Sequence, residues 1–255
     1  MNYVENLKVK IFADGADRAS MLALYANPLI KGFTTNPTLM RNAGVCDYEE
    51  FARTLLCDIP DRPISFEVFA DDFGEMEWQA KEIASWGGQV NVKIPVTNTK
   101  GESSAPLIRR LAKAGIRLNV TALMTLEQVR MVADCLADAP PSYVSLFAGR
   151  VADTGVDPVP IMSEAVKILS EYPKLELIWA SPREILNIFQ ADSIGCQVIT
   201  VTHDLLKKLK IVGHNLEEYS LDTVKMFFND AQGAGYRLIR TNQVPCEVSV
   251  TALSD

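Results

Sequence analysis

The sequence predicts an α/β protein built as a single (β/α)₈ TIM barrel with an additional C-terminal helix. Short apolar runs alternate with longer amphipathic segments along most of the chain, which is typical of parallel strands joined by crossover helices. Eight such runs occur in a chain of 255 residues, and a typical barrel of this class has about 250 residues. A doubly wound open sheet is the alternative, but no GxGxxG motif follows the first strand.

The eight predicted strands are short runs rich in apolar and β-branched residues. They cover residues 8–13, 30–35, 63–69, 89–94, 115–120, 142–147, 174–179 and 196–201. Because helical segments fill the gaps, we expect right-handed crossovers and a parallel sheet. The carboxyl ends of the strands are therefore predicted to meet at one rim, where barrels of this class carry their active sites.

The predicted helices combine apolar residues at helical spacing with recognisable start signals. Segments 73–86 and 125–138 are amphipathic. The pair Asp157–Pro158 predicts a helix start, with an N-cap followed by a first-turn proline. The segment Ser181–Glu184 (SPRE) predicts another start of the same kind, with Ser181 as the cap.

The pattern changes after the eighth strand. A helical piece over 203–210 leads to a second amphipathic helix at about 219–232, which would cover the barrel bottom or pack on a neighbouring subunit. No linker, repeat or low-complexity segment divides the chain. We therefore predict a barrel domain over 1–235 that includes this helix, followed by a C-terminal tail over 236–255.

Composition narrows the function classes. A net charge of −7 argues against non-specific nucleic acid binding, so an anionic substrate would need its own Arg or Lys cluster. Five scattered cysteines without a CxxC and only two histidines suggest neither a metal site nor a disulfide framework. No signal peptide or membrane span is evident, so we expect a cytoplasmic protein that needs no cofactor.

The run Gln89–Val96 (QVNVKIPV) contains the most informative residue, Lys93. A buried ammonium needs a carboxylate partner, a cavity or a lowered pKa. A free amine attacks carbonyl carbons and forms a Schiff base. Taken alone, Lys93 is more simply a strand lysine that pairs with an acid or reaches the rim.

Polar residues occur at or just beyond the ends of seven consecutive predicted strands. The polar candidates are Asp14, Thr35, Asn36, Glu67, Lys93, Asn119, Thr121, Ser145, Arg150, Ser181 and Arg183, and the apolar Phe147 beside Ser145 is a further candidate. Each has a structural interpretation: Asp14, Asn36 and Ser181 could be helix N-caps, and Glu67 could simply pair with Lys93. Together, around one strand lysine, they are hard to explain as packing.

These residue types suit a ketone substrate. Lys93 would form a carbinolamine and then an iminium, and Glu67 would move protons through a water held by Thr121. Asp14 could take the proton from a hydroxyl β to the iminium, which breaks a C–C bond in retro-aldol fashion. Asn36 and Asn119 are suited to sugar hydroxyls.

A phosphate site is predicted beside this lysine. Arg150 and Arg183 supply positive charge, and Ser181 would add a hydroxyl at a helix N-terminus.

Seven segments, in order, resemble the transaldolase family of class I Schiff-base enzymes. They are FADGAD (12–17), GFTTNPTLM (32–40), SFEVFAD (65–71), VNVKIPVT (90–97), GIRLNVTALMTLEQ (115–128), YVSLFAGRVAD (143–153) and WASPREI (179–185). The resemblance covers about residues 8–210. It implies a (β/α)₈ barrel and phosphorylated sugar substrates.

By matching position, the resemblance implies a role for ten of the candidates. Lys93 would be the Schiff-base lysine, Asp14 would act on the substrate hydroxyl, and Glu67 with Thr121 would serve the catalytic water. The dihydroxyacetone unit would lie against Asn36 and Asn119, with Ser145 lining the site. Phosphate would lie against Arg150, Arg183 and Ser181.

The family also contains fructose-6-phosphate aldolases, which this chain resembles in length and in the stretch 228–234 (FNDAQGA). Those enzymes typically carry Gln at the position of Glu67 and Tyr at the position of Phe147, so this chain favours transfer over release. The compact subfamily implies a homo-oligomer, a pentamer or decamer in which each C-terminal helix reaches a neighbour. The longer tail after Gly235, the short AGRVADTG loop and the SPR segment depart from that pattern.

Three functions follow from these residues. The first is a transaldolase that moves a dihydroxyacetone unit from a ketose phosphate to an aldose phosphate. The second is a fructose-6-phosphate aldolase-like enzyme or a specialised biosynthetic transaldolase. The third is a sugar-phosphate-binding barrel without turnover, which would have no need of a strand amine.

Overall fold

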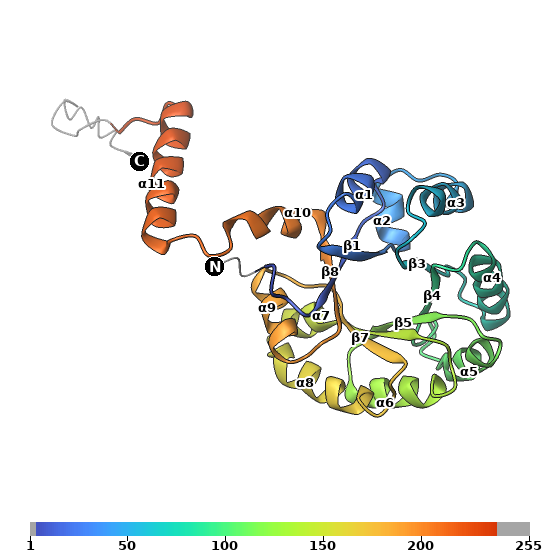
Figure 1. The fold of residues 1–255 in the computed structure, drawn as a ribbon. Helices are drawn as coiled ribbons and strands as arrows, with labels where there is room; N and C mark the ends of the chain where they lie inside the picture. Colours follow the sequence, from blue (N-terminus) through green and yellow to red (C-terminus); the bar gives the residue numbers. More distant parts are fainter. Residues whose placement is uncertain (1–3, 239–255) are drawn as a thin grey trace, which may run out of the picture. The chain divides into compact units, whose positions relative to one another are not determined.

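A computed structural model describes residues 4–238 of the chain, which divides into two compact units, Met1–Val212 and Gly213–Asp255. The first unit is a closed barrel of parallel strands in the order β1 to β8, with helices outside the ring (Figure 1). This confirms the predicted (β/α)₈ fold. The closure leaves no sheet edge, and it brings the carboxyl ends of all strands to one rim.

The strands lie where the apolar runs predict them, with shifted ends. They are β1 Lys10–Asp14, β2 Ile30–Thr34, β3 Ile64–Glu67, β4 Val90–Pro95, β5 Leu118–Leu123, β6 Ser142–Leu146, β7 Leu175–Trp179 and β8 Val198–Thr202. The third strand ends earlier than predicted, at Glu67. The fifth runs to Leu123, past the predicted end at 120, and its register with β6 is irregular between Val120 and Leu123.

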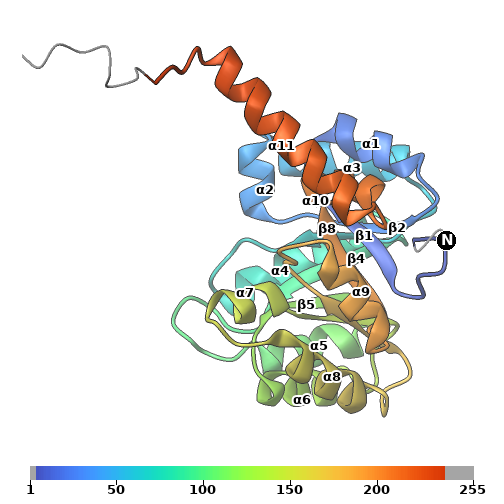
Figure 2. The ribbon, with the colours of Figure 1, turned by 90° about the vertical axis from the view of Figure 1, so that its left-hand side faces the viewer.

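The helices of the first unit follow the strands. They are α1 Arg18–Tyr25, α2 Pro37–Asn42, α3 Tyr48–Asp58, α4 Phe73–Ser85, α5 Ala105–Lys113, α6 Leu126–Cys135, α7 Ala148–Asp153, α8 Pro158–Leu169, α9 Leu186–Ser193, α10 His203–Leu206 and the 3₁₀ turn η1 Lys207–Ile211. The side view shows α2 and α7 at the same end of the barrel (Figure 2). Asp157 caps α8 as predicted, with its side chain accepting from the amide of Val159.

The predicted cap at Ser181 is wrong. Asp14, for which a cap was the structural alternative to a site role, does not cap a helix either, because Asp17 caps α1. The helix predicted at Ser181 begins at Leu186, because the Asn187 side chain accepts hydrogen bonds from the amides of Arg183 and Glu184 and folds this segment as a turn. Ser181 itself has φ of 60°, in the left-handed region that a helix cap does not use.

Period-two alternation separates the two faces of the barrel wall. Residues such as Phe33, Phe66, Val92 and Trp179 are fully buried in the large core under the surrounding helices. The alternate positions face the interior, where the only apolar cluster among the described residues is Phe12, Ile178, Ala180 and Val198. Most other inward positions are polar, so the interior carries chemistry as well as packing.

The amino-terminal end of the interior contains an ion pair and an aromatic contact. Lys10 Nζ lies 2.6 Å from the Glu176 carboxylate, and Phe12 meets the ring of Tyr143 edge-on at 5.6 Å between centroids. Burial raises the pKa of Tyr143 to about 12, so its hydroxyl stays protonated. In barrels of this class, the groups that meet a substrate lie at the opposite, carboxyl end.

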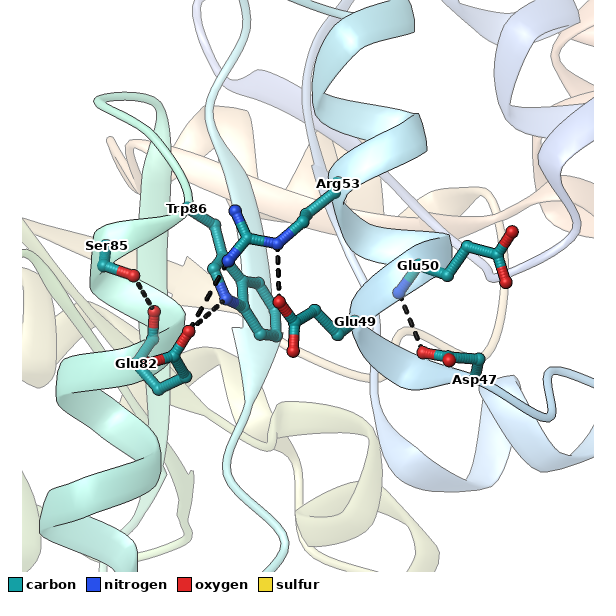
Figure 3. Close-up of polar contacts among 7 residues, drawn as sticks. All are labelled: Asp47, Glu49, Glu50, Arg53, Glu82, Ser85 and Trp86. Atoms are coloured by element: carbon teal, nitrogen blue, oxygen red, sulfur yellow. Dashed lines mark hydrogen bonds and ion pairs between the residues drawn. The ribbon is translucent and has the colours of Figure 1, made fainter.

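A polar cluster joins α3 to α4 outside β3 (Figure 3). Arg53 Nε donates to Glu49 at 2.6 Å and lies across from Glu82, whose Oε1 also accepts from Trp86 Nε1 at 3.2 Å. These side chains are largely exposed, so each pair adds little free energy of unfolding. Their structural consequence is to link the two helices that flank the strand ending at Glu67.

The second unit contains α11, Leu216–Gly233, where the sequence predicts a helix at about 219–232. Asn215 caps it by accepting from the amides of Glu217 and Glu218. Several large apolar side chains of α11 are exposed in the single chain: Leu216, Tyr219, Leu221, Val224, Phe227 and Phe228. The predicted tail lies outside the described residues from 239 onward. Across 4–238, no helix has the length and apolar character to cross a membrane.

Candidate active site

Two cavities at the carboxyl end of the barrel gather ten of the twelve predicted site residues. They share Asn36, Lys93, Thr121, Phe147 and Arg150. One cavity adds Asp14, Asn119, Ser145 and Ser181, and the other adds Glu67. Thr35 and Arg183 line neither. We call the two cavities together the rim site.

Lys93 lies at the centre of the rim site with a carboxylate partner. Only 6% of the residue is exposed, and its Nζ lies 3.1 Å from Glu67 Oε2. The two residues are register partners on β4 and β3. Lys93 Nζ also donates to the backbone carbonyl of Thr35 at 3.2 Å, which is how Thr35 contributes. The pair offsets the cost of burying the ammonium and holds a proton acceptor beside the amine.

Asp14 enters the same site from β1. Thr34 Oγ1 donates to its Oδ1 at 2.7 Å. Burial raises the pKa of the Asp14 carboxyl, and the charge of Lys93 and the Thr34 hydrogen bond oppose that rise. A carboxyl with a raised pKa holds a proton more tightly than a surface aspartate, which suits general acid–base work at neutral pH.

The Thr121 hydroxyl is buried and has no hydrogen-bond partner among the described residues. Buried polar atoms are nearly always paired, so this one is free for a substrate atom or a water in the cavity. The next residue, Ala122, has φ of 65°. A left-handed alanine is a strained conformation of the kind that occurs at functional sites.

Asn119 is held by a buried chain of hydrogen bonds. Its Nδ2 donates to Ser65 Oγ at 3.0 Å, and its Oδ1 accepts from Ser145 Oγ at 2.7 Å. The amide is therefore fixed in orientation and keeps one N–H for a ligand. Asn36 has two roles. Its Oδ1 caps α2 by accepting a hydrogen bond from the amide of Leu39, and Asn36 also lines both cavities.

Arg150 is the arginine that lies within the rim site. Its guanidinium sits 5.8 Å from the ring centre of Phe147. Arg183 lies beside the site and is engaged elsewhere: Nε donates to Asp153 Oδ1 at 2.8 Å, Nη2 bonds the other Asp153 oxygen, and Nη1 donates to Ser181 Oγ at 2.9 Å. The structure therefore does not bring both arginines into the cavities.

The backbones of α7 and the β7–α9 loop approach very closely beside these arginines. The Gly149 amide donates to the Ala180 carbonyl at 3.3 Å. A Cβ built on Gly149 would lie 1.5 Å from the Ser181 carbonyl oxygen, which no side chain can occupy. Glycine is therefore required at 149 for Ser181 and Arg183 to take these positions.

Sequence reasoning missed four residues that shape the site. Thr34 binds Asp14, Ser65 binds Asn119, Thr200 lines a cavity, and the Tyr48 hydroxyl donates to the Glu67 carbonyl at 2.7 Å. For Thr34 and Ser65 a signal was available, because Ser65 lies two residues before Glu67 on the same strand and Thr34 lies two residues before Asn36. Tyr48 lies on α3, and no local sequence pattern predicts its hydrogen bond to the Glu67 carbonyl.

Within residues 4–238, no group of three or more His, Cys, Asp or Glu is placed to hold a metal ion. The rim site offers an amine, two carboxyl groups, hydroxyls, amides and a guanidinium.

Fold and site together define a (β/α)₈ barrel with a buried lysine–carboxylate pair among polar strand ends. The family model for transaldolase/fructose-6-phosphate aldolase matches residues 11–240, so the chain belongs to this family.

Curated relatives agree with the family model. A "Probable transaldolase" of Dehalococcoides mccartyi is 34% identical over 202 residues, covering 79% of this chain and 90% of the relative. Another, of Methanococcus maripaludis, is 32% identical over 218 residues, covering 84% and 97%. A "Probable transaldolase 2" of Listeria monocytogenes is 33% identical over 202 residues, covering 79% and 88%. The family relationship therefore spans most of the chain.

Solved structures share the fold at low identity. Dihydrodipicolinate synthase from Rhodopseudomonas palustris has a TM-score of 0.57 at 13% identity, covering 89% of this chain and 80% of that one. Orotidine 5'-monophosphate decarboxylase from Metallosphaera sedula has a TM-score of 0.53 at 14% identity, covering 82% and 98%. These similarities concern the barrel architecture alone.

Proposed function

We propose that the chain is a transaldolase that transfers a dihydroxyacetone unit from a ketose phosphate, sedoheptulose 7-phosphate or fructose 6-phosphate, to an aldose phosphate. The observation that carries the proposal is the buried Lys93 amine, 3.1 Å from Glu67, in a cavity that also holds Asp14. Membership of the family supports it, and the family's name covers transfer and release alike.

Lys93 begins the reaction. Its ammonium passes a proton to Glu67, and the free amine adds to the ketone carbon to form a carbinolamine. Glu67 returns a proton to the departing hydroxyl through a water, which the unpaired Thr121 hydroxyl is placed to hold. The protonated hydroxyl leaves the carbinolamine as a water molecule, and the product is an iminium joined to Nζ.

Asp14 acts next on the iminium. Its carboxylate takes the proton from the hydroxyl on the carbon β to the iminium carbon. The bond between the α and β carbons then breaks, and its electrons convert the iminium into an enamine. The aldose phosphate leaves. The enamine then attacks the aldehyde of an acceptor, Asp14 returns its proton, and hydrolysis of the new iminium frees Lys93. The raised pKa of Asp14 suits both directions of this transfer.

Orientation and affinity come from the remaining rim residues. The fixed amide of Asn119, with Ser145 behind it, and the exposed part of Asn36 face the three-carbon unit. Arg150 and Ser181, which line the same cavity, would bind the terminal phosphate. Phe147 offers no hydroxyl near the imine and Glu67 is a carboxylate, which in this family resembles the transferring members and favours transfer over release.

The assembly and setting are part of the proposal. The exposed apolar residues of α11 support a homo-oligomer, a pentamer or decamer, in which that helix is covered. The net charge of −7 supports the absence of a nucleic acid partner. The proposal further takes the chain as a cytoplasmic enzyme of sugar phosphate metabolism with no membrane partner and no cofactor.

A labelled transfer assay tests the proposal. Fructose 6-phosphate carrying ¹³C in its first three carbons is incubated with erythrose 4-phosphate, and products are followed by mass spectrometry. Transfer gives a labelled seven-carbon ketose phosphate. Labelled free dihydroxyacetone as the main product would make the protein an aldolase, and the absence of both products would leave a binding protein. Lys93→Met removes the amine, and Lys81→Met, at an exposed ion-paired lysine, is the matched control.

A further inference from the structure

The guanidinium of Arg183 is held by a carboxylate that the predicted phosphate site does not include. Asp153 accepts from Nε and Nη2, the edge of an arginine that best matches an anion, and Ser181 accepts from Nη1. Only the N–H groups of Arg183 that do not bind Asp153 or Ser181 are therefore available to a phosphate.

The placement of Asp153 is built into α7. It lies one turn after Gly149, on the same side of the helix. Gly149 is the residue pressed against the Ser181 carbonyl, and a Cβ there would also lie 3.4 Å from Arg183 Cζ. The close approach at Gly149 thus sets Arg183 within reach of Asp153.

Charge distinguishes this arginine from its neighbour. Arg150 lines both cavities and makes no ion pair within residues 4–238, while Arg183 and Asp153 cancel. Two guanidinium groups and one carboxylate leave one net positive charge. The hydrogen bond with Arg183 lowers the pKa of Asp153 and raises the pKa of Arg183, so both stay charged at neutral pH.

We propose that Asp153 is a specificity-determining residue that neutralises Arg183, so that the enzyme discriminates only modestly between ketoses with and without a terminal phosphate. The inference rests on the proposed function, because it concerns the donor of the same reaction. The discriminating contact is then Arg150, with Ser181 beside it. Phosphorylated ketose remains the better donor, but by a smaller factor than two free arginines would give.

A charge series tests this directly, using fructose 6-phosphate and fructose as donors. The summed charge of Arg150, Arg183 and residue 153 is two in Asp153→Asn, one in the wild type and in Asp153→Asn/Arg183→Met, and zero in Arg183→Met. The ratio of kcat/KM values for the two donors should fall in that order. For Asp153→Asn we expect a rise of about fivefold, because the pair is half exposed. The rise should come from KM for fructose 6-phosphate.

The dependence of the kcat/KM ratio on ionic strength is a second measurement, which a purely structural role of Asp153 would not change. The ratio should fall more steeply with ionic strength in Asp153→Asn than in the wild type. Glu164→Gln, which removes one surface charge from an exposed pair with Lys167, should leave the ratio unchanged. A ratio that falls or stays constant in Asp153→Asn would overturn the inference and make Asp153 a support for Arg183 or a bystander.

The proposed function is tested separately. Borohydride reduction of a mixture with fructose 6-phosphate should fix the ketose on Lys93 in the wild type and in every member of the series. An adduct with a constant ratio rejects the role of Asp153 alone, while the absence of an adduct in the wild type rejects the donor chemistry itself.

Discussion

Two cation–carboxylate pairs lie at the same rim of this barrel and differ chiefly in their exposure. The side chains of Lys93 and Glu67 are 8% and 17% exposed, whereas those of Arg183 and Asp153 are 44% and 52% exposed. In the first pair the cation is an amine that can lose its proton; in the second it is a guanidinium that cannot. The difference teaches that a buried lysine pair is suited to bond formation and an exposed arginine pair to adjusting charge.

The largest effect is expected from removing the amine of the buried pair. Lys93→Met should lower the transfer rate by roughly 10⁴-fold or more, because the covalent route is lost. It should also abolish the borohydride adduct. Turnover is measured beside a circular dichroism melt, and Lys81→Met is the control. Transfer within tenfold of the wild type in a folded Lys93→Met would exclude Lys93 as the nucleophile.

Asp14→Asn separates the Schiff base from the bond cleavage. Lys93 and Glu67 remain paired, so the adduct should still form, but transfer should fall by about 10²- to 10⁴-fold because no group takes the hydroxyl proton. Single-turnover trapping and product analysis report the two steps. Loss of the adduct together with transfer would instead place Asp14 in imine formation.

Asp14 also predicts a pH dependence of stability. Its folded-state pKa is raised above 3.8, so the folded chain holds the proton more tightly than the unfolded chain. Asp14 therefore adds stability below its unfolded pKa, and that contribution is lost as pH rises through the folded value. Asp14→Asn should thus unfold at higher urea than the wild type at pH 7.5, with the gain shrinking towards pH 4. A variant less stable at pH 7.5 would contradict a buried, desolvated Asp14.

Gly149→Ala should disturb the exposed Arg183–Asp153 pair by moving the backbone that carries Arg183. The added Cβ would lie 1.5 Å from the Ser181 carbonyl oxygen, so the loop must move, at a cost of about 2–4 kcal/mol. KM for fructose 6-phosphate should rise, because Ser181, a proposed phosphate contact, moves with the loop, while the Lys93 adduct still forms. Gly87→Ala, where the added Cβ has no atom within 4 Å, is the matched control for chemical denaturation. Equal stability of the two variants would disprove the close approach.

The smallest effect concerns the main chain that carries Glu67. Tyr48→Phe removes the hydrogen bond from the Tyr48 hydroxyl to the Glu67 carbonyl and should cost about 1 kcal/mol of folding free energy. The transfer rate should fall only a few-fold, because the Lys93–Glu67 contact itself is retained. Tyr25→Phe, which loses an exposed bond to Asp61, serves as the comparison. A loss as large as that of Asp14→Asn would assign Tyr48 a more direct part.

The two pairs were not equally predictable from sequence. Lys93 and Glu67 lie inside apolar strands, where period-two alternation and sheet register place them together, and the barrel follows from the same runs. The Arg183–Asp153 pair joins residues 30 apart in sequence through a turn built by the Asn187 side chain and a left-handed Ser181. A Ser-Pro sequence locally resembles a helix start, so the sequence alone misplaced the start of α9. For the same reason it predicted Arg183 as a phosphate ligand without its partner Asp153.

The most direct test of the Lys93 chemistry is peptide mapping after borohydride reduction with fructose 6-phosphate. We predict a single modified peptide that contains Lys93, an adduct mass that corresponds to the bound ketose or its three-carbon fragment, and loss of the adduct when erythrose 4-phosphate is added before reduction. Modification of another lysine, or no modification in an enzyme that still transfers the labelled unit, would contradict the assignment of Lys93 as the Schiff-base residue.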